Sequence, residues 1–242
     1  MRRGISVAQG AIALLVLGMA VSVSESRGEE GKPYPNPARF EKAIARYEAQ
    51  DKKTPPPAGA VVCIGSSSMG GWHRTIKKDL APLTVIPRGF GGSNMNDALH
   101  YADRIVIPYR PRAVLVYEGD NDIACGVAPE QVRDAFAAFV AKVRRALPDV
   151  RIYVLSVKPS IRRWKKWPQM RAANGLIEAM CSQDKGLTYI DVASPMLDAD
   201  GTPKKDIFRP DGLHMNGKGY AIWTETARPI LVEREREFEK GM

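Results

Sequence analysis

The segment Asp211–His214 places a carboxylate and an imidazole three residues apart, a pair that can activate a nucleophile. In a turn, Asp211 can accept a hydrogen bond from one ring nitrogen of His214 and leave the other free to take a proton. Asp97 and His100 share this spacing, so the spacing alone is weak evidence. They fall in a helical pattern, where we expect a local helix contact. The position of Asp211 and His214 after the last predicted strand favours that pair as carboxylate and base.

A serine-rich segment, Gly65–Trp72, supplies the candidate nucleophile. Ser67 would lie at a strand-to-helix turn, where its hydroxyl can project into a cleft, although serine is also a favoured helix cap there. Ser66 and Ser68 are weaker candidates. Met69 excludes the G-x-S-x-G elbow of α/β-hydrolases. His73 follows Trp72 and is expected to serve in packing or at the surface.

Two further loops could stabilise a developing oxyanion. Gly92 lies in a glycine-rich loop (residues 88–94) whose backbone N–H groups can approach a ligand closely, or which forms a plain tight turn. Asn121 lies in the segment 117–122 and offers a neutral amide donor, or an Asx turn. With the N–H of Ser67, the N–H of Gly92 and the side chain of Asn121 form the predicted oxyanion hole.

The elements that must position these loops alternate along the chain. Short apolar runs predict strands at 60–64, 84–86, 113–117, 151–157 and 187–192, and helical patterns lie between them, most clearly at 129–147, 170–181 and 218–239. A helix is also expected from Asn36-Pro37 to the proline run after Thr54. This alternation predicts an α/β fold, a flavodoxin-like three-layer α/β/α sandwich with a five-stranded parallel sheet. The four loops above would then meet at the carboxyl edge of the sheet.

The N-terminal segment predicts export. Arg2 and Arg3 precede an apolar run, so residues 1–25 indicate a signal peptide, with an uncleaved membrane anchor as the alternative. Residues 26–36 would be a tether, and residues 37–242 a single domain that includes the N-terminal helix. We expect a periplasmic or secreted protein whose mature form has no membrane span.

Taken together, the motifs resemble the SGNH hydrolase superfamily, also called GDSL esterases, in its bacterial branch with G-S-S-S in the first block. The likeness runs from about Phe40 to about Trp223. It implies Ser67 as nucleophile, Asp211 and His214 as its triad partners, and Gly92 and Asn121 as oxyanion donors. Many relatives have Asp where this chain has Ser66, a position outside the triad.

Composition limits the ligands and binding partners that the protein is expected to have. The formal net charge of +9 indicates a basic solvated surface rather than nucleic-acid binding. No cysteine spacing suggests a metal, no cofactor is expected, and Cys63 is typical of a buried core residue. A disulfide between Cys125 and Cys181 is left open. The loop after the fourth predicted strand carries Trp164 and Trp167, which could contact a substrate or simply cover the surface.

The sequence thus predicts an esterase that removes a short acyl group from a carbohydrate or a small lipid. Three alternatives remain: an acyltransferase with the same triad chemistry, a flavodoxin-like module that binds phosphate, and a basic wall-binding protein without catalysis. Neither the natural ester nor the oligomeric state follows from the sequence.

Overall fold

The computed structural model describes Met1 and residues 31–241, and five parallel strands form its central sheet. The strands lie in the order β2-β1-β3-β4-β5, which is the flavodoxin-like order. The predicted fold class is therefore confirmed. The strand bounds are β1 Val61–Gly65, β2 Val85–Gly89, β3 Ala113–Tyr117, β4 Arg151–Leu155 and β5 Leu187–Ile190.

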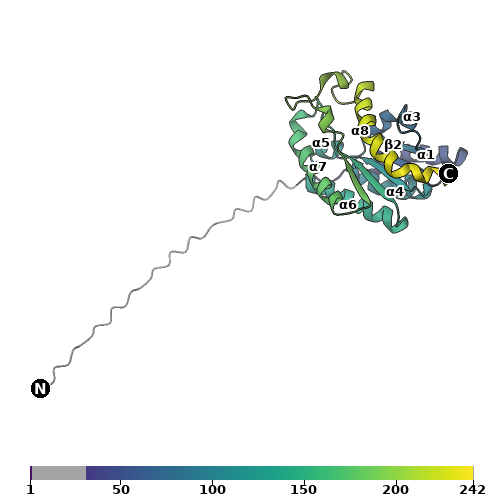
Figure 1. The fold of residues 1–242 in the computed structure, drawn as a ribbon, viewed down its shortest axis with the longest axis horizontal. Coiled ribbons are helices and arrows are strands. Elements are labelled where there is room, and N and C mark those ends of the chain that lie inside the picture. Colours follow the sequence, from purple (N-terminus) through teal and green to yellow (C-terminus); the bar gives the residue numbers. More distant parts are fainter. Residues whose placement is uncertain (2–30, 242) are drawn as a thin grey trace. The chain divides into compact units, whose positions relative to one another are not determined.

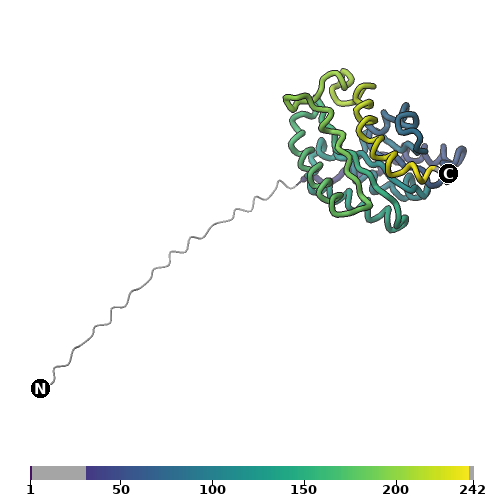
Figure 2. The backbone as a smooth tube through the Cα atoms, in the orientation of Figure 1, coloured from purple at the N-terminus to yellow at the C-terminus, as the bar shows by residue number. Residues whose placement is uncertain are grey.

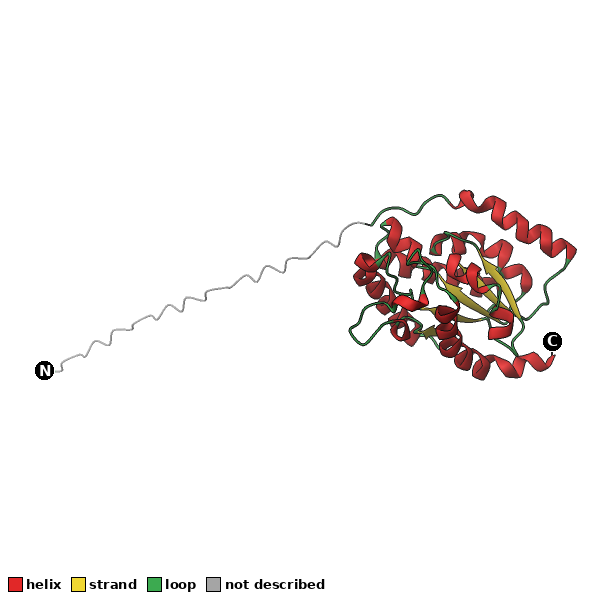
Figure 3. Ribbon diagram, turned by 90° about the horizontal axis from the view of Figure 1, so that it is seen from above, coloured by secondary structure: helices red, strands yellow, loops and turns green. Residues whose placement is uncertain are grey.

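Helices cover both faces of this sheet (Figures 1 and 3). One face packs against α1 Glu41–Lys53, α4 Met95–Ile105, α6 Pro129–Ala146 and α7 Trp167–Ser182. The other packs against α2 Ser67–Trp72, α3 Ile76–Asp79 and α8 Gly217–Glu235, while α5 Asp120–Cys125 follows the carboxyl end of β3. Short 3-10 helices span Pro37–Phe40, Ile107–Tyr109, Trp164–Lys166, Ser194–Met196, Lys205–Ile207 and Arg236–Gly241.

The strands read as continuous apolar runs because both of their faces are buried. In β1, Val62 and Ile64 pack in one core, and Val61 and Cys63 pack in the other. Such two-sided burial is the rule for parallel sheets, and it explains why the strands lack polar alternation.

Most predicted elements lie where expected, with shifted ends. The helix expected from Asn36 begins as a 3-10 turn, with the Asn36 side chain accepting from Ala38 N, and continues as α1. Strand β2 runs further than predicted, through Pro87. It is an edge strand, where the missing N–H of a proline is tolerated.

The predicted signal peptide or anchor, residues 1–25, lies outside the described residues, apart from Met1. Of the predicted tether, residues 31–36 are described: Lys32 N donates to Gly126 O, and the Tyr34 hydroxyl donates to Asp122. At the other end, Glu239 accepts from both the N–H and the hydroxyl of Thr84, so the chain end lies beside β2 (Figure 2). Within the described residues, no helix combines the length and the apolar character needed to cross a membrane.

Candidate active site

Ser67, His214 and Asp211 form a hydrogen-bonded chain although 147 residues separate the first two. The Ser67 Oγ lies 3.1 Å from His214 Nε2, and His214 Nδ1 lies 2.6 Å from Asp211 Oδ2. Because an ionised carboxylate can only accept, Nδ1 carries the ring proton and Nε2 is left to accept from the serine hydroxyl. This arrangement suits removal of the serine proton.

A tight turn shapes the loop that carries the carboxylate and the imidazole. Gly212 has φ +64°, a conformation that favours glycine, and the turn brings His214 back onto Asp211. Asp211 Oδ1 also accepts from the backbone N–H groups of Leu213 and His214, both at 2.9 Å. The hydrogen bond from His214, followed by those two backbone N–H groups, lowers the pKa of Asp211 below its usual value. The carboxylate is thus ionised and fixed in position.

Close backbone contacts place Ser67 at the first residue of α2. A Cβ on Gly65 would lie 2.3 Å from Tyr117 O, and a Cβ on Gly89 would lie 2.3 Å from Gly70 N. Only glycine fits at either contact, because real Cβ atoms do not approach so closely. These contacts hold the start of α2 against the carboxyl ends of β1, β2 and β3.

The predicted oxyanion donors lie beside the serine. Gly92 has φ +88°, and the position of a Cβ on neighbouring Gly91 would lie 3.7 Å from Ser67 Cβ. Asn121 is the second residue of α5, and its Nδ2 donates to Ser93 O at 2.8 Å. The Asn121 side chain thus contacts the loop that carries Gly92, and this loop lies next to Ser67.

Two basic residues, Lys158 and Arg163, lie beside Asn121 and the loop of His214, in contacts that the sequence did not predict. Arg163 Nη1 donates to Asn121 Oδ1 at 3.0 Å and to Asp120 Oδ1 at 2.7 Å. Because a guanidinium can only donate, it turns the amide oxygen toward itself and the amide NH₂ toward Ser93. Lys158 is fully buried; its Nζ donates to Leu213 O at 2.9 Å and lies 3.4 Å from Asp120 Oδ2. It thereby joins the start of α5 to the loop of the imidazole.

Buried carboxyl groups lie beneath the loop of Gly92. Glu118 accepts from the Ser93 hydroxyl, while Asp122 accepts from Met95 N, Gly119 N and the Tyr34 hydroxyl. Burial, and then the charge of Asp122, raises the pKa of Glu118 well above its usual value. Burial likewise raises the pKa of Asp122 to about 6. The loop thus contacts a buried carboxyl group whose neutral form is favoured by its surroundings.

The other histidines lie apart from Ser67. The expected contact between Asp97 and His100 is wrong: Asp97 caps α4 through Asn94 and pairs with Arg39, and exposed His100 packs its ring edge-on against Tyr101. The carboxylate of Asp97 instead accepts from the backbone N–H of Asn94 at the start of α4 and pairs with Arg39.

His73 accepts a hydrogen bond from Gly89 N at 2.8 Å. Burial, then the charge of Arg88, lowers the pKa of His73 to about 4, so the ring is a neutral packing group. Ser66 and Ser68, the weaker nucleophile candidates, are buried.

The tryptophans offered as substrate contacts stack on each other, with ring centroids 5.9 Å apart. Trp167 belongs to the core and is 8% exposed, and Trp164 packs against the same core partly exposed. Trp167 is therefore a core residue, while Trp164 keeps part of its surface exposed.

Cys63, Cys125 and Cys181 are free thiols in the structure, so the disulfide left open by the sequence is not formed there. Among the described residues, no group of His, Cys, Asp or Glu side chains is arranged to hold a metal ion.

Comparison with known proteins identifies the class to which this fold and site belong. The chain belongs to the GDSL-like Lipase/Acylhydrolase family, whose sequence model matches residues 58–222. It is accordingly an ester-hydrolysing enzyme. A search of curated proteins gave no match.

Solved structures share the fold at low identity. A GDSL-like lipase from Bacteroides thetaiotaomicron is 21% identical with a TM-score of 0.69, over 78% of this chain and 97% of its own. A carbohydrate esterase family 3 protein from Talaromyces cellulolyticus is 18% identical with a TM-score of 0.58, over 74% and 99%. An acetyl-xylooligosaccharide esterase from Geobacillus is 14% identical with a TM-score of 0.58, over 73% and 94%.

Proposed function

We propose that the protein is an SGNH-type serine esterase that transfers the acyl group of a carboxylic ester to water. The observation that carries this proposal is the chain Ser67 Oγ–His214 Nε2–Asp211, with spacings of 3.1 and 2.6 Å. These are the contacts that a serine nucleophile and its base need before substrate binds.

The reaction proceeds in two halves. His214 Nε2 takes the proton of Ser67 as Oγ attacks the ester carbonyl, and the N–H groups of Ser67 and Gly92 and the Asn121 amide hold the resulting oxyanion. Collapse breaks the ester C–O bond, and His214 returns the proton to the leaving alcohol. Water, deprotonated by His214, then attacks the acyl-serine; collapse breaks the bond between the acyl carbon and Oγ, His214 returns the proton to Ser67, and the acid leaves. Asp211 stabilises the imidazolium in both halves.

We propose a short acyl group on a carbohydrate, or on a small lipid, as the substrate. The side chains of His214 and Asp211 are each 36% exposed, so the reaction centre is open enough for a bulky alcohol and for water. The solved neighbours include a carbohydrate esterase and an acetyl-xylooligosaccharide esterase, which supports the carbohydrate. The apolar N-terminal run after Arg2 and Arg3 supports export to the compartment of such polymers.

The test compares Ser67→Ala with Ser66→Ala on 4-nitrophenyl acetate and on acetylated xylo-oligosaccharides. Loss of the nucleophile should lower kcat by about 10⁴-fold or more, whereas the neighbouring hydroxyl makes no helix-capping hydrogen bond and its loss should change little. A fluorophosphonate probe should label wild type once, at Ser67. Retained activity in Ser67→Ala, or labelling elsewhere, would refute the assignment. Transfer to added sugar alcohols in preference to water would identify an acyltransferase instead.

A further inference from the structure

A basic hollow lies beside the loop that carries the imidazole. It is open, has a volume of about 610 Å³, and includes Asp211 and Gly212 in its wall. Its other walls come from the loop after β4 and from the segment around the Lys205–Ile207 3-10 helix. The side chains that give it its character are Arg162, Lys205, Arg209, Ile161 and Phe208.

Backbone hydrogen bonds hold two of these cations to the catalytic loop. Arg162 N donates to Gly212 O at 3.0 Å, and Arg209 N donates to His214 O at 2.7 Å. Gly212 N in turn donates to Arg209 O at 2.9 Å. The positions of both arginine backbones are therefore fixed relative to the imidazole.

The hollow keeps a net positive charge because its lining holds three cations and a single carboxylate, that of Asp211. Asp211 is occupied by His214 and by two backbone N–H groups, and Asp206 pairs with Lys218 at 2.9 Å. In the described part of the chain, no ion pair joins Arg162, Lys205 or Arg209 to a carboxylate. Arg209 Nε donates to Met215 O at 3.1 Å, which orients the guanidinium and leaves its terminal nitrogens for a ligand.

The chemistry tells which part of an ester faces this hollow. The oxyanion must face Gly92 and Asn121, whereas the leaving oxygen must face His214 Nε2 to receive the proton. Arg162 and Arg209 flank the loop that carries His214, so the part of the substrate nearest this loop is also the part nearest the cations. Hence the alcohol portion of the ester, rather than its acyl group, extends toward the cations.

We infer that this esterase acts on esters whose alcohol portion carries negative charge, namely an acylated acidic oligosaccharide whose carboxylates dock in the basic hollow. The inference rests on the proposed function of Ser67 and His214. Ile161, 44% exposed, and Phe208 supply apolar wall for the face of a sugar ring. An anionic membrane fits less well, because Met1, Ile161 and Phe238 are the large apolar residues exposed in the described chain, too few for an inserting surface.

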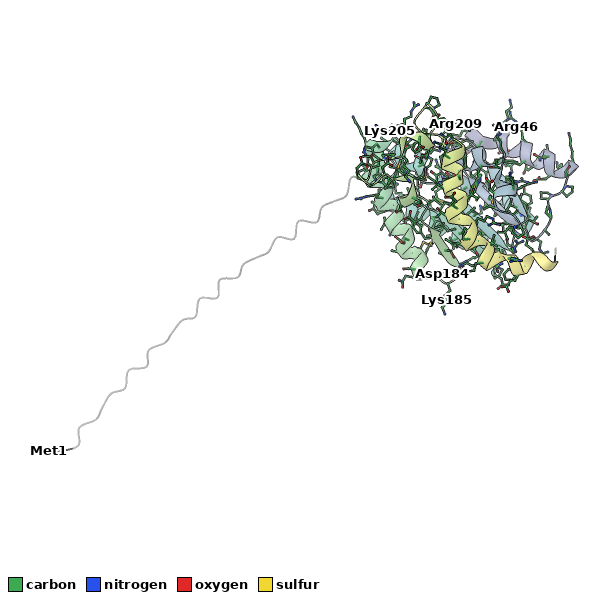
Figure 4. The ribbon with its side chains drawn as sticks, turned by 45° about the horizontal axis from the view of Figure 1, so that its top comes forward. Met1, Arg46, Asp184, Lys185, Lys205 and Arg209 are labelled. Carbon is green, nitrogen blue, oxygen red and sulfur yellow. The ribbon has the colours of Figure 1, made fainter. Side chains whose placement is uncertain are left out.

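The experiment measures kcat/KM on two matched substrates, an acetylated oligouronide and the same oligomer with its carboxylates reduced to alcohols. The test variant is Arg162→Glu/Lys205→Glu, and the control Arg145→Glu/Lys185→Glu makes the same charge change elsewhere. Figure 4 shows Lys205 and Arg209 on the side of the molecule opposite Lys185. Arg145 and Lys185 are both exposed. They precede β4 and β5, so they lie toward the amino ends of the strands, whereas the catalytic loops follow the carboxyl ends.

At low salt, the preference for the charged substrate should fall about tenfold in the test variant and stay at the wild-type value in the control. High salt should remove the preference from wild type. An unchanged preference in the test variant, or an equal fall in the control, would overturn the inference.

Loss of binding to phosphatidylglycerol vesicles without a change in preference would also overturn it, in favour of a lipid surface. The Ser67→Ala variant separates the two proposals. If it hydrolyses both oligomers like wild type, the proposed function fails; if it is inactive on both while the charge variants match wild type, only this inference fails.

Discussion

Two Asp-x-x-His segments, Asp97–His100 and Asp211–His214, share the same spacing but differ in burial, backbone geometry and hydrogen-bond partners. Asp97 is fully buried at the start of α4, whereas the Asp211 side chain is 36% exposed in a loop. Burial raises the pKa of Asp97 to about 6, while hydrogen bonds, first that of His214, lower the pKa of Asp211. The same two residue types thus stay apart in one region, where Asp97 caps a helix, and form a hydrogen-bonded pair in the other.

Backbone geometry explains the difference. In α4 the carboxylate of Asp97 turns toward the helix N-terminus, where Asn94 N donates to it at 2.9 Å, and Arg39 pairs with it as well. In the loop, Gly212 reverses the chain, so His214 folds back onto the carboxylate. A turn, not the spacing, brings imidazole and carboxylate together.

The strongest test removes each imidazole. His214→Ala should lower kcat/KM for 4-nitrophenyl acetate by about 10⁴-fold or more, because Ser67 loses its base. His100→Ala should stay within about twofold of wild type, because that ring is exposed and contacts Tyr101. Steady-state kinetics on both variants, with circular dichroism to verify folding, checks this. A collapse in His100→Ala with His214→Ala tolerated would reverse the comparison.

A smaller loss is expected at the oxyanion donor. Asn121→Ala should lower kcat by about 100- to 1000-fold with little change in KM, because the amide acts on the charge that develops in the transition state. Retention of most activity would show that Asn121 does not face the oxyanion.

Arg163→Met sharpens this test, since Arg163 orients the amide of Asn121 rather than touching substrate. Arg163→Met should lower kcat by about tenfold, which is less than the loss in Asn121→Ala. In the double variant it should lower kcat little below the value of Asn121→Ala alone. Full additivity of the two losses would mean that Arg163 acts independently of the amide.

How far the sequence predicts this molecule depends on the range of the interactions. Apolar runs and helical periods are local signals, so the five strands and the layers that cover them were predictable. The proximity of Ser67 and His214 was predictable as well, because the loops that follow parallel strands meet at one edge of the sheet.

Contacts between distant segments left weaker signals. Arg163 reaches Asn121 across 42 residues, and Lys158 reaches Leu213 across 55, so no local pattern predicts either contact. Trp164 and Trp167 were candidates for substrate contact because their segment follows the fourth predicted strand and combines indoles with cations. Only the packing of α7 against α6 and the sheet shows that Trp167 belongs to the core.

The smallest effect concerns the buried acids that share a region with Asp97. Glu118 faces the carboxyl groups of Asp122, Asp97 and Asp120, and burial, followed by the charge of Asp122, raises its pKa. Because the folded pKa is raised, its contribution to stability is complete below the pKa of an unfolded glutamate, about 4.3, and is lost as pH rises toward the folded value. Glu118→Gln keeps an acceptor for the Ser93 hydroxyl and removes this titration.

The free energy of unfolding of Glu118→Gln relative to wild type should therefore increase with pH, by at most about 1.4 kcal/mol per pH unit. Urea unfolding at pH 5, 6, 7 and 8 measures it, with exposed Glu225→Gln as the control that stays parallel to wild type. Ser93, the neighbour of Gly92 in this loop, donates its hydroxyl hydrogen bond to Glu118. Ionisation of Glu118 would therefore also disturb the proposed oxyanion hole. Parallel profiles for all three proteins would mean that Glu118 ionises in the fold without cost, and that the buried region differs from the Asp211 loop in exposure alone.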